Sequence, residues 1–282
     1  MGVMIQIAAN KACVIMEEIS LKEIQDIELE IASEIDSICR AHNLTYYLAY
    51  GSLIGAARNK GFIPWDDDMD IMMMRRDYEI LLENFNAWTS NDKFQLRTHR
   101  DSSGFCAFAK IVDATTIVKS KYDRPDLDSS IWVDIVPLDY SSPSDKNIDF
   151  KLKFWALITS FILTNKDVGS SWFVRLAKRL ICPVAHRLDY IKYLTKFENL
   201  ILQSCIEEKE TLRDFACDLD ARMYYEKEWF GVTELEFEGR KFFAPTEFDK
   251  ILTSRYGDWR TPPKESERYS HVATAYRVDK NE

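Results

Sequence analysis

The fold of this chain is decided by one stretch, GSLIGAARNKGFIPWDDDMDI, at residues 51–71. Residues 45–50, just before it, are rich in aromatic and β-favouring side chains and predict a strand. The Gly-Ser pair that follows predicts a turn, and residues 53–59 suit a short helix. Pro64 then forces an extended chain into four carboxylates within five residues. The stretch therefore predicts a strand, a turn, a short helix and an acidic strand in succession.

The acidic cluster predicts a metal site. An extended chain over residues 66–71 would direct Asp66, Asp68 and Asp70 to one face and Asp67 to the other. Carboxylates on one face, roughly 6.6–6.8 Å apart along the strand, repel one another unless a cation neutralises them. Hard oxygen ligands select magnesium, manganese or calcium over zinc or copper.

Two simpler interpretations of the cluster compete with a metal site. A solvated acidic loop stays open, although the apolar residues on both sides of the cluster disfavour it. An EF-hand calcium loop fails, because Ile71 stands where that loop needs glycine and Asp77 where it needs glutamate.

A further carboxylate, Asp134, lies in an apolar run at residues 131–136 that predicts a buried strand. A lone buried Asp costs several kcal/mol unless it is paired or bound to metal. Asp134 therefore belongs either to the metal site or to a structural hydrogen bond. Gly51 and Ser52 precede a short helix, which would present backbone N–H groups and a hydroxyl to an anion.

Hydrophobic periodicity predicts an α/β chain with a sheet at its centre. The helical spacings cover residues 17–42 and 75–88, and the strand patterns cover residues 94–97, 105–113, 116–120 and 131–138. Residues 149–198 predict two or three helices, broken at Gly169 and Pro183. Aromatic short strands over residues 229–243 and a helix over residues 246–256 follow.

The charge is unevenly distributed. The 282 residues hold 37 Lys and Arg against 46 Asp and Glu, a net charge of −9 that disfavours nucleic acid as a partner. Residues 149–198 nevertheless carry nine basic and four acidic side chains, a net +5 that leaves −14 for the rest. This basic, aromatic stretch predicts either peripheral contact with an anionic membrane or ordinary helix packing with a solvated basic face. The six cysteines show no zinc-site spacing and suggest reduced thiols in a cytoplasmic protein.

The Gly-Ser pair, the alternating carboxylates and a third carboxylate on a later strand occur in the order of the nucleotidyltransferase fold, resembling the polymerase-beta superfamily. The whole of residues 51–71 looks like the signature of the LicD family, whose relatives include fukutin-type proteins. Asn59 departs from that pattern, where the family often has His. Further pieces resemble the same family: Arg75-x-Asp77-Tyr78, Lys110-Ile111-x-Asp113, Val133-Asp134-Ile135, Glu228-Trp229-Phe230 and Tyr256-Gly257-Asp258.

This resemblance implies an α/β (α+β) fold with a nucleotidyltransferase-like mixed sheet core flanked by helices and carrying a helical insert. It divides the chain into a catalytic core with an N-terminal helix at residues 1–140, the insert at 141–222, and a C-terminal segment at 223–282 that completes the core.

The resemblance also implies site residues. Asp68, Asp70 and Asp134 would be catalytic and hold Mg²⁺, with Mn²⁺ as an alternative. Asp134 would complete the metal site or accept the acceptor's proton. Gly51 and Ser52 would grip phosphate, and Arg58 and Lys110 would neutralise charge on the phosphoryl oxygens and the leaving group, unless they are surface charges. His271 is either a substrate contact or an exposed structural residue.

The implied reaction moves phosphocholine, or a similar phospho-alcohol, from CDP-choline or another CDP-alcohol to a glycan or lipid-linked glycan and releases CMP. The alternatives are a nucleotidyltransferase that adds a nucleoside monophosphate from a nucleoside triphosphate, a glycosyltransferase with a metal-binding Asp-x-Asp, and a catalytically inactive binding module.

Overall fold

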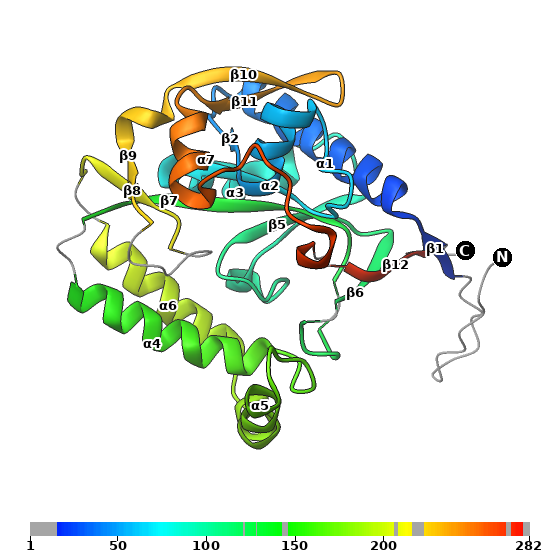
Figure 1. The fold of residues 1–282 in the computed structure, drawn as a ribbon, viewed down its shortest axis with the longest axis vertical. Coiled ribbons are helices and arrows are strands. Elements are labelled where there is room, and N and C mark those ends of the chain that lie inside the picture. Colours follow the sequence, from blue (N-terminus) through cyan, green and yellow to red (C-terminus); the bar gives the residue numbers. More distant parts are fainter. Residues whose placement is uncertain are drawn as a thin grey trace.

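The computed structural model describes residues 16–120, 122–127, 129–142, 146–205, 208–215, 223–268 and 272–278. Its centre is a mixed seven-stranded sheet in which β3 and β7 run parallel and the other neighbours run antiparallel (Figure 1). Along the sheet lie β2 (Tyr47–Leu48), β3 (Met69–Met74), β7 (Trp132–Ser141), β5 (Ala109–Asp113) and β4 (Phe94–Arg97), with β8 (Thr211–Arg213) and β9 (Tyr225–Glu226) extending from β7.

Helices α1 (Leu21–Ala41) and α3 (Arg75–Trp88) pack against each other and against this sheet. Isoleucines at helical spacing form the buried side of α1. The helix begins at Leu21 because Ser20 and Glu23 form a capping box. Residues Met16–Ile19 (β1), most of which the sequence pattern placed in this helix, instead form a strand.

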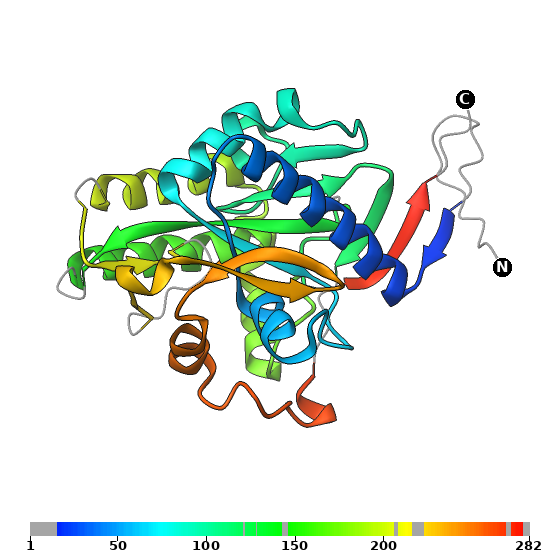
Figure 2. The ribbon, with the colours of Figure 1, turned by 90° about the horizontal axis from the view of Figure 1, so that it is seen from above.

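Two smaller sheets complete the core at its edges (Figure 2). In one, β12 (Val272–Val278) lies between β1 and β6 (Thr116–Ser120). In the other, β10 (Val232–Phe237) pairs with β11 (Arg240–Pro245), followed by α7 (Phe248–Tyr256).

The helical insert consists of α4 (Lys146–Leu163), α5 (Trp172–Ala185) and α6 (Tyr190–Ser204). Helices α4 and α6 pack around a small core of their own, and α5 packs on α4. Pro183 lies inside α5 near its end and does not break the helix, contrary to the sequence prediction. None of the helices in the described residues is both long and apolar enough to cross a bilayer.

The mixed α/β fold with a helical insert is confirmed, and α3, β4 and β6 have the predicted bounds. Two local predictions in the deciding stretch are wrong. Gly51 and Ser52 form no turn but lie in α2 (Tyr50–Ile54), which continues as a π-helix over Gly55–Asn59. The acidic strand begins only at Met69, so the first three carboxylates precede it.

Candidate active site

The site is built on three neighbouring strands whose register aligns three charged residues. The parallel pairing of β3 with β7 places Asp70 opposite Asp134, and the antiparallel pairing of β5 with β7 places Lys110 opposite Asp134. All three line one large cavity. Lys110 Nζ lies 2.9 Å from Asp134 Oδ1 and 3.9 Å from the centre of the Trp132 ring. Asp134, which the sequence predicted to need either a metal or a hydrogen-bond partner, is therefore paired with Lys110.

The remaining carboxylates approach the same place from the loop before β3. Ligand oxygens of Asp66, Asp67 and Asp68 lie within 4.8 Å of one another. Asp66 and Asp68 line the cavity, whereas buried Asp67 accepts a 2.7 Å hydrogen bond from the backbone N–H of Val272. Asp67 therefore ties β12 to the acidic loop, a role that the sequence did not indicate.

Burial and mutual repulsion make these carboxylates hard to ionise together. Burial raises the pKa of Asp66 to about 8, with the charge of Asp68 adding to the effect. Burial also raises the pKa of Asp70 well above its ordinary value, and the charges of Asp68 and Asp134 push it further. Although burial alone would lower the pKa of Lys110, the facing Asp134 carboxylate raises it, so Lys110 remains a cation.

The donor set fits a hard divalent cation. The carboxylates of Asp66, Asp68, Asp70 and Asp134 all line the cavity and offer only oxygen ligands. Two of them, Asp70 and Asp134, are buried on adjacent strands. A metal held here by Asp68, Asp70 and Asp134 stays a prediction.

Gly51 and Ser52 stand at the first turn of α2, next to the acidic loop. A Cβ atom on Gly51 would come within 2.6 Å of Asp66 Oδ2, so glycine permits the close approach of helix and carboxylate. Ser52 is buried, and its Oγ accepts a 2.9 Å hydrogen bond from Asp70 N. Gly51 lines the cavity and Ser52 is not among its lining residues, and the expectation that the two grip phosphate stays a prediction.

Cationic side chains line the same cavity as the carboxylates. Arg58 lines the cavity, and its Nη1 donates to the backbone oxygen of Trp259 at 3.0 Å. Burial lowers the pKa of Arg58, and the charge of Asp66 opposes that shift. Arg255 and Arg268 also line the cavity, and the sequence did not single them out. Both arginines lie in the C-terminal segment that resembles the LicD family, and this is the one sequence signal that could have marked them as site residues.

Each of these two arginines lies over an aromatic ring. The Arg268 guanidinium lies 3.9 Å from the centre of the Trp65 ring, and Arg255 lies 4.3 Å from the Tyr50 ring. Tyr50 itself has a φ of 44°, which is strained for a residue with a side chain, and its hydroxyl donates to Asp214. The strained residue directly precedes Gly51 and lines the cavity.

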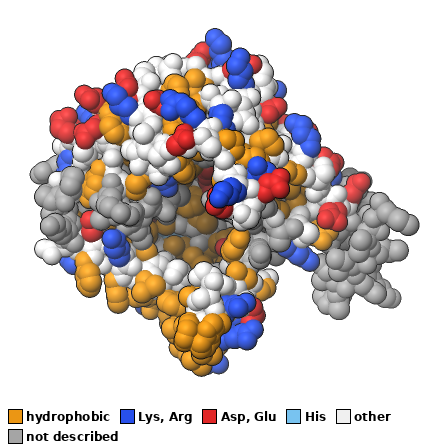
Figure 3. All heavy atoms as spheres, viewed as in Figure 1, with side chains coloured by type: hydrophobic (Ala, Val, Ile, Leu, Met, Phe, Trp, Pro, Cys, Tyr) orange, Lys and Arg blue, Asp and Glu red, His pale blue; other side chains and the backbone are white. Residues whose placement is uncertain are grey.

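The cavity has a volume of about 1100 Å³ and opens as a hollow in the face shown in Figure 3. Its walls come from the core sheet, the C-terminal segment and the helical insert. The insert contributes Ala156, Thr159, Ser160 and Leu163 from α4, and Leu194 and Phe197 from α6. His271 lies outside the described residues.

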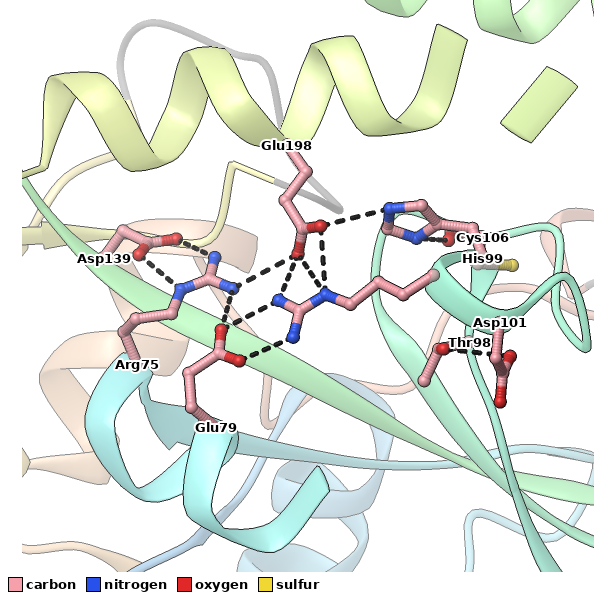
Figure 4. Close-up of polar contacts among 9 residues, drawn as sticks. Arg75, Glu79, Thr98, His99, Asp101, Cys106, Asp139 and Glu198 are labelled. Atoms are coloured by element: carbon pink, nitrogen blue, oxygen red, sulfur yellow. Dashed lines mark hydrogen bonds and ion pairs between the residues drawn. The ribbon is translucent and has the colours of Figure 1, made fainter. Parts of the chain in front are cut away.

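A buried ionic network fixes the insert to the core (Figure 4). Glu198 of α6 receives hydrogen bonds from the Arg100 guanidinium at 2.6–3.2 Å and lies 3.1 Å from His99 Nε2. His99 Nδ1 lies 3.0 Å from the backbone oxygen of Cys106, a cavity residue. Arg75 of α3 pairs with Asp139 at 2.6 Å and lies 3.7 Å from Glu198. The network therefore ties α6 of the insert to α3 and β7 of the core.

An acidic sheet edge beside a glycine-containing helix, with arginines lining the same large cavity, is the arrangement of a domain of the nucleotidyltransferase type. Residues 43–152 match the family described as LicD/FKTN/FKRP, nucleotidyltransferase domain. The chain thus carries a LicD-family domain, and the family resemblance is confirmed.

Relatives extend the similarity beyond this domain. The chain is 29% identical over 276 residues to the lipopolysaccharide cholinephosphotransferase LicD of Haemophilus influenzae, a match that covers 93% of this chain and 99% of the relative. It is also 35% identical over 48 residues to an uncharacterized protein of Rickettsia prowazekii, a match that covers 17% of this chain and 18% of that protein.

Proposed function

We propose that the protein is a LicD-type phosphotransferase that moves phosphocholine, or a similar phospho-alcohol, from a CDP-linked donor to a hydroxyl of a cell-surface glycan precursor. The alignment of Asp70, Asp134 and Lys110 on three adjacent strands of one cavity carries this proposal. Similarity to a lipopolysaccharide cholinephosphotransferase over nearly its whole length supports the choice of transferred group and acceptor.

Asp68, Asp70 and Asp134 would hold Mg²⁺, which when bound neutralises the donor diphosphate and the charge that develops on the leaving group. Arg58, together with Arg255 and Arg268, supplies cations in the same cavity, where they would contact the phosphates of an anionic donor. Lys110, held as a cation by Asp134, adds a charge at the floor of the cavity.

The reaction forms a bond between the acceptor hydroxyl oxygen and the phosphorus that bears the alcohol. The bond from that phosphorus to the CMP oxygen breaks, and CMP leaves. The acceptor's proton passes to a carboxylate of the cluster, for which Asp134 is the proposed base where it does not itself complete the metal site.

The size of the cavity supports two substrates. Its volume of about 1100 Å³ slightly exceeds the range of roughly 300–1,000 Å³ common for pockets that hold a single small molecule. The acidic wall would take the donor, and the wall formed by α4 and α6 would take the glycan. We propose that the protein meets this acceptor at the cytoplasmic face of the cell membrane.

One assay tests the proposal against its alternative. Purified protein is incubated with a series of CDP-alcohols or nucleoside triphosphates and a glycan acceptor, with Mg²⁺ or with EDTA. Mg²⁺-dependent release of CMP from a CDP-alcohol is expected. Pyrophosphate release from a triphosphate, with no CMP, would instead indicate a nucleotidyltransferase.

A further inference from the structure

Helix α5 presents an unusually apolar surface to solvent. Phe173, Leu176, Leu180 and Val184 repeat at helical spacing on one side, and Leu180 and Phe173 are 72% and 65% exposed. Cys182 and Ala185 form its narrow buried side. A helix of a water-soluble domain normally buries its broadest apolar face, so this face is suited to a second, apolar environment.

Helix α4 extends the same surface. Phe150, Phe154 and Leu157 share one side of α4 and are exposed, Phe150 at 75%. Figure 3 shows the exposed apolar side chains as a cluster over α5, below the hollow of the cavity. We call the exposed apolar residues of α4 and α5 the apolar ridge. It comprises Phe150, Phe154, Leu157, Trp172, Phe173, Leu176, Leu180, Ile181 and Val184.

Basic side chains flank the ridge. Helix α5 contains Arg175, Lys178 and Arg179 and no acidic residue. Exposed Arg175 and Arg179 lie together along one edge of its apolar side, although Arg179 shares its charge with Asp167 at 3.0 Å. The ridge therefore lies within the one strongly basic part of an otherwise acidic chain.

We propose that the apolar ridge lies in the interface of an anionic membrane, with α5 parallel to the bilayer plane. An apolar helix face rich in Trp, Phe and Leu beside arginines is the pattern of such interfacial helices. Anionic lipid headgroups complement the flanking arginines, whereas a second copy of the chain would bring like charges together. This proposal does not depend on the chemistry proposed for the active site.

The arrangement of α4 connects the ridge to the cavity. Ala156, Thr159 and Leu163 lie on a side of α4 that faces the cavity, while Phe154 and Leu157 point away from it. One helix, about 10–12 Å across, therefore separates the membrane surface from the substrate space. An acceptor held at the membrane by a lipid would then have its sugar at the depth of the cavity.

Vesicle flotation tests the proposal. The full-length protein is expected to float with phosphatidylcholine vesicles that contain phosphatidylglycerol, and floating should weaken at high salt. The triple variant Phe173→Ser/Leu180→Ser/Val184→Ser is expected to lose at least tenfold in vesicle binding. Val232→Ser, which changes a half-exposed valine of β10, is the matched control and should float like the unchanged protein.

A second pair of variants tests the electrostatic part. Arg175→Glu/Arg179→Glu is expected to reduce binding to anionic vesicles at least tenfold, whereas Arg240→Glu/Lys241→Glu, with the same charge change on β11, should not. Circular dichroism and thermal unfolding should match the unchanged protein, because all replaced side chains are exposed.

Three results would overturn the proposal: no binding to anionic vesicles at low salt, equal binding by the apolar triple variant, or a stable dimer that this variant abolishes in place of vesicle binding. Asp68→Asn separates the two proposals, because it should remove transfer and leave vesicle binding unchanged.

Discussion

The hydroxyl oxygen of Ser52 accepts a 2.9 Å hydrogen bond from the backbone N–H of Asp70. This buried bond joins the first turn of α2 to the second residue of β3. The helix that brings Gly51 next to Asp66 is thereby fixed to the strand that carries Asp70. Ser52 is thus a positioning residue for the acidic wall.

Ser52→Ala should destabilise the protein and weaken its use of Mg²⁺. The substitution leaves the buried N–H of Asp70 without its acceptor, which costs about 1–3 kcal/mol. Urea unfolding measures the loss, and titration of transfer activity with Mg²⁺ should show a higher half-saturating concentration. Ser37→Ala, on the exposed side of α1, is the control. An unchanged unfolding free energy with a raised KM for the donor would instead indicate direct phosphate binding.

Lys110→Met should be strongly destabilising. It removes the ionic partner of Asp134, and breaking a buried pair from one side costs roughly 3–5 kcal/mol. The double variant Lys110→Met/Asp134→Asn no longer buries an unpaired charge and should regain most of this stability, as measured by urea unfolding. It should still lack transfer activity. A double variant as unstable as the single one would show that the pair contributes through packing alone.

Local signals explain which elements the sequence could predict. Helix α3 and strands β4 and β6 have clear apolar periodicities and were predicted with their bounds. The start of α1 was missed because Met16–Ile19 forms a strand only by pairing with β12 at the other end of the chain. Short-range pattern carries no information on that partner.

The candidate site was predictable to the extent that its residues lie on strands. The apolar run around Asp134 predicted a buried strand, and the fold places it beside Asp70. Arg255 and Arg268 were missed because the C-terminal segment reaches the cavity only through tertiary packing. Asp67 was predicted to point away from the other three carboxylates, and it accepts a backbone hydrogen bond that holds β12.

Glu198→Gln should lower stability in a pH-dependent manner. Burial alone would raise the pKa of Glu198, but hydrogen bonds from His99 and Arg100 outweigh it and lower the pKa from 4.5 to about 2. Because the folded-state pKa is depressed, the stabilisation is present above pH 4.5 and is lost as pH falls towards 2. The shift corresponds to about 3 kcal/mol.

Urea unfolding of the unchanged protein and of the Glu198→Gln variant across this pH range checks the prediction. The difference between their free energies of unfolding should be largest near neutral pH and should become smaller as the pH is lowered. Glu83→Gln, which changes a carboxylate of α3 outside the network, is the control and should show no such trend. A difference that stays constant with pH would contradict an ionised Glu198 in the folded protein.

Asp70→Asn should separate metal binding from folding. Without metal, the variant should be at least as stable as the unchanged protein, because the amide replaces a carboxyl group whose ionisation is disfavoured by burial and by the charges of Asp68 and Asp134. At a Mg²⁺ concentration about 100 times its dissociation constant, the unchanged protein should gain about 2.7 kcal/mol, and the variant should gain little. Thermal unfolding with and without Mg²⁺ measures both effects, and Asp26→Asn, on exposed α1 surface, is the control. An Asp70→Asn protein that keeps its Mg²⁺-induced stabilisation would place the metal on other carboxylates, such as Asp66, Asp67 and Asp68, whose oxygens lie within 4.8 Å of one another.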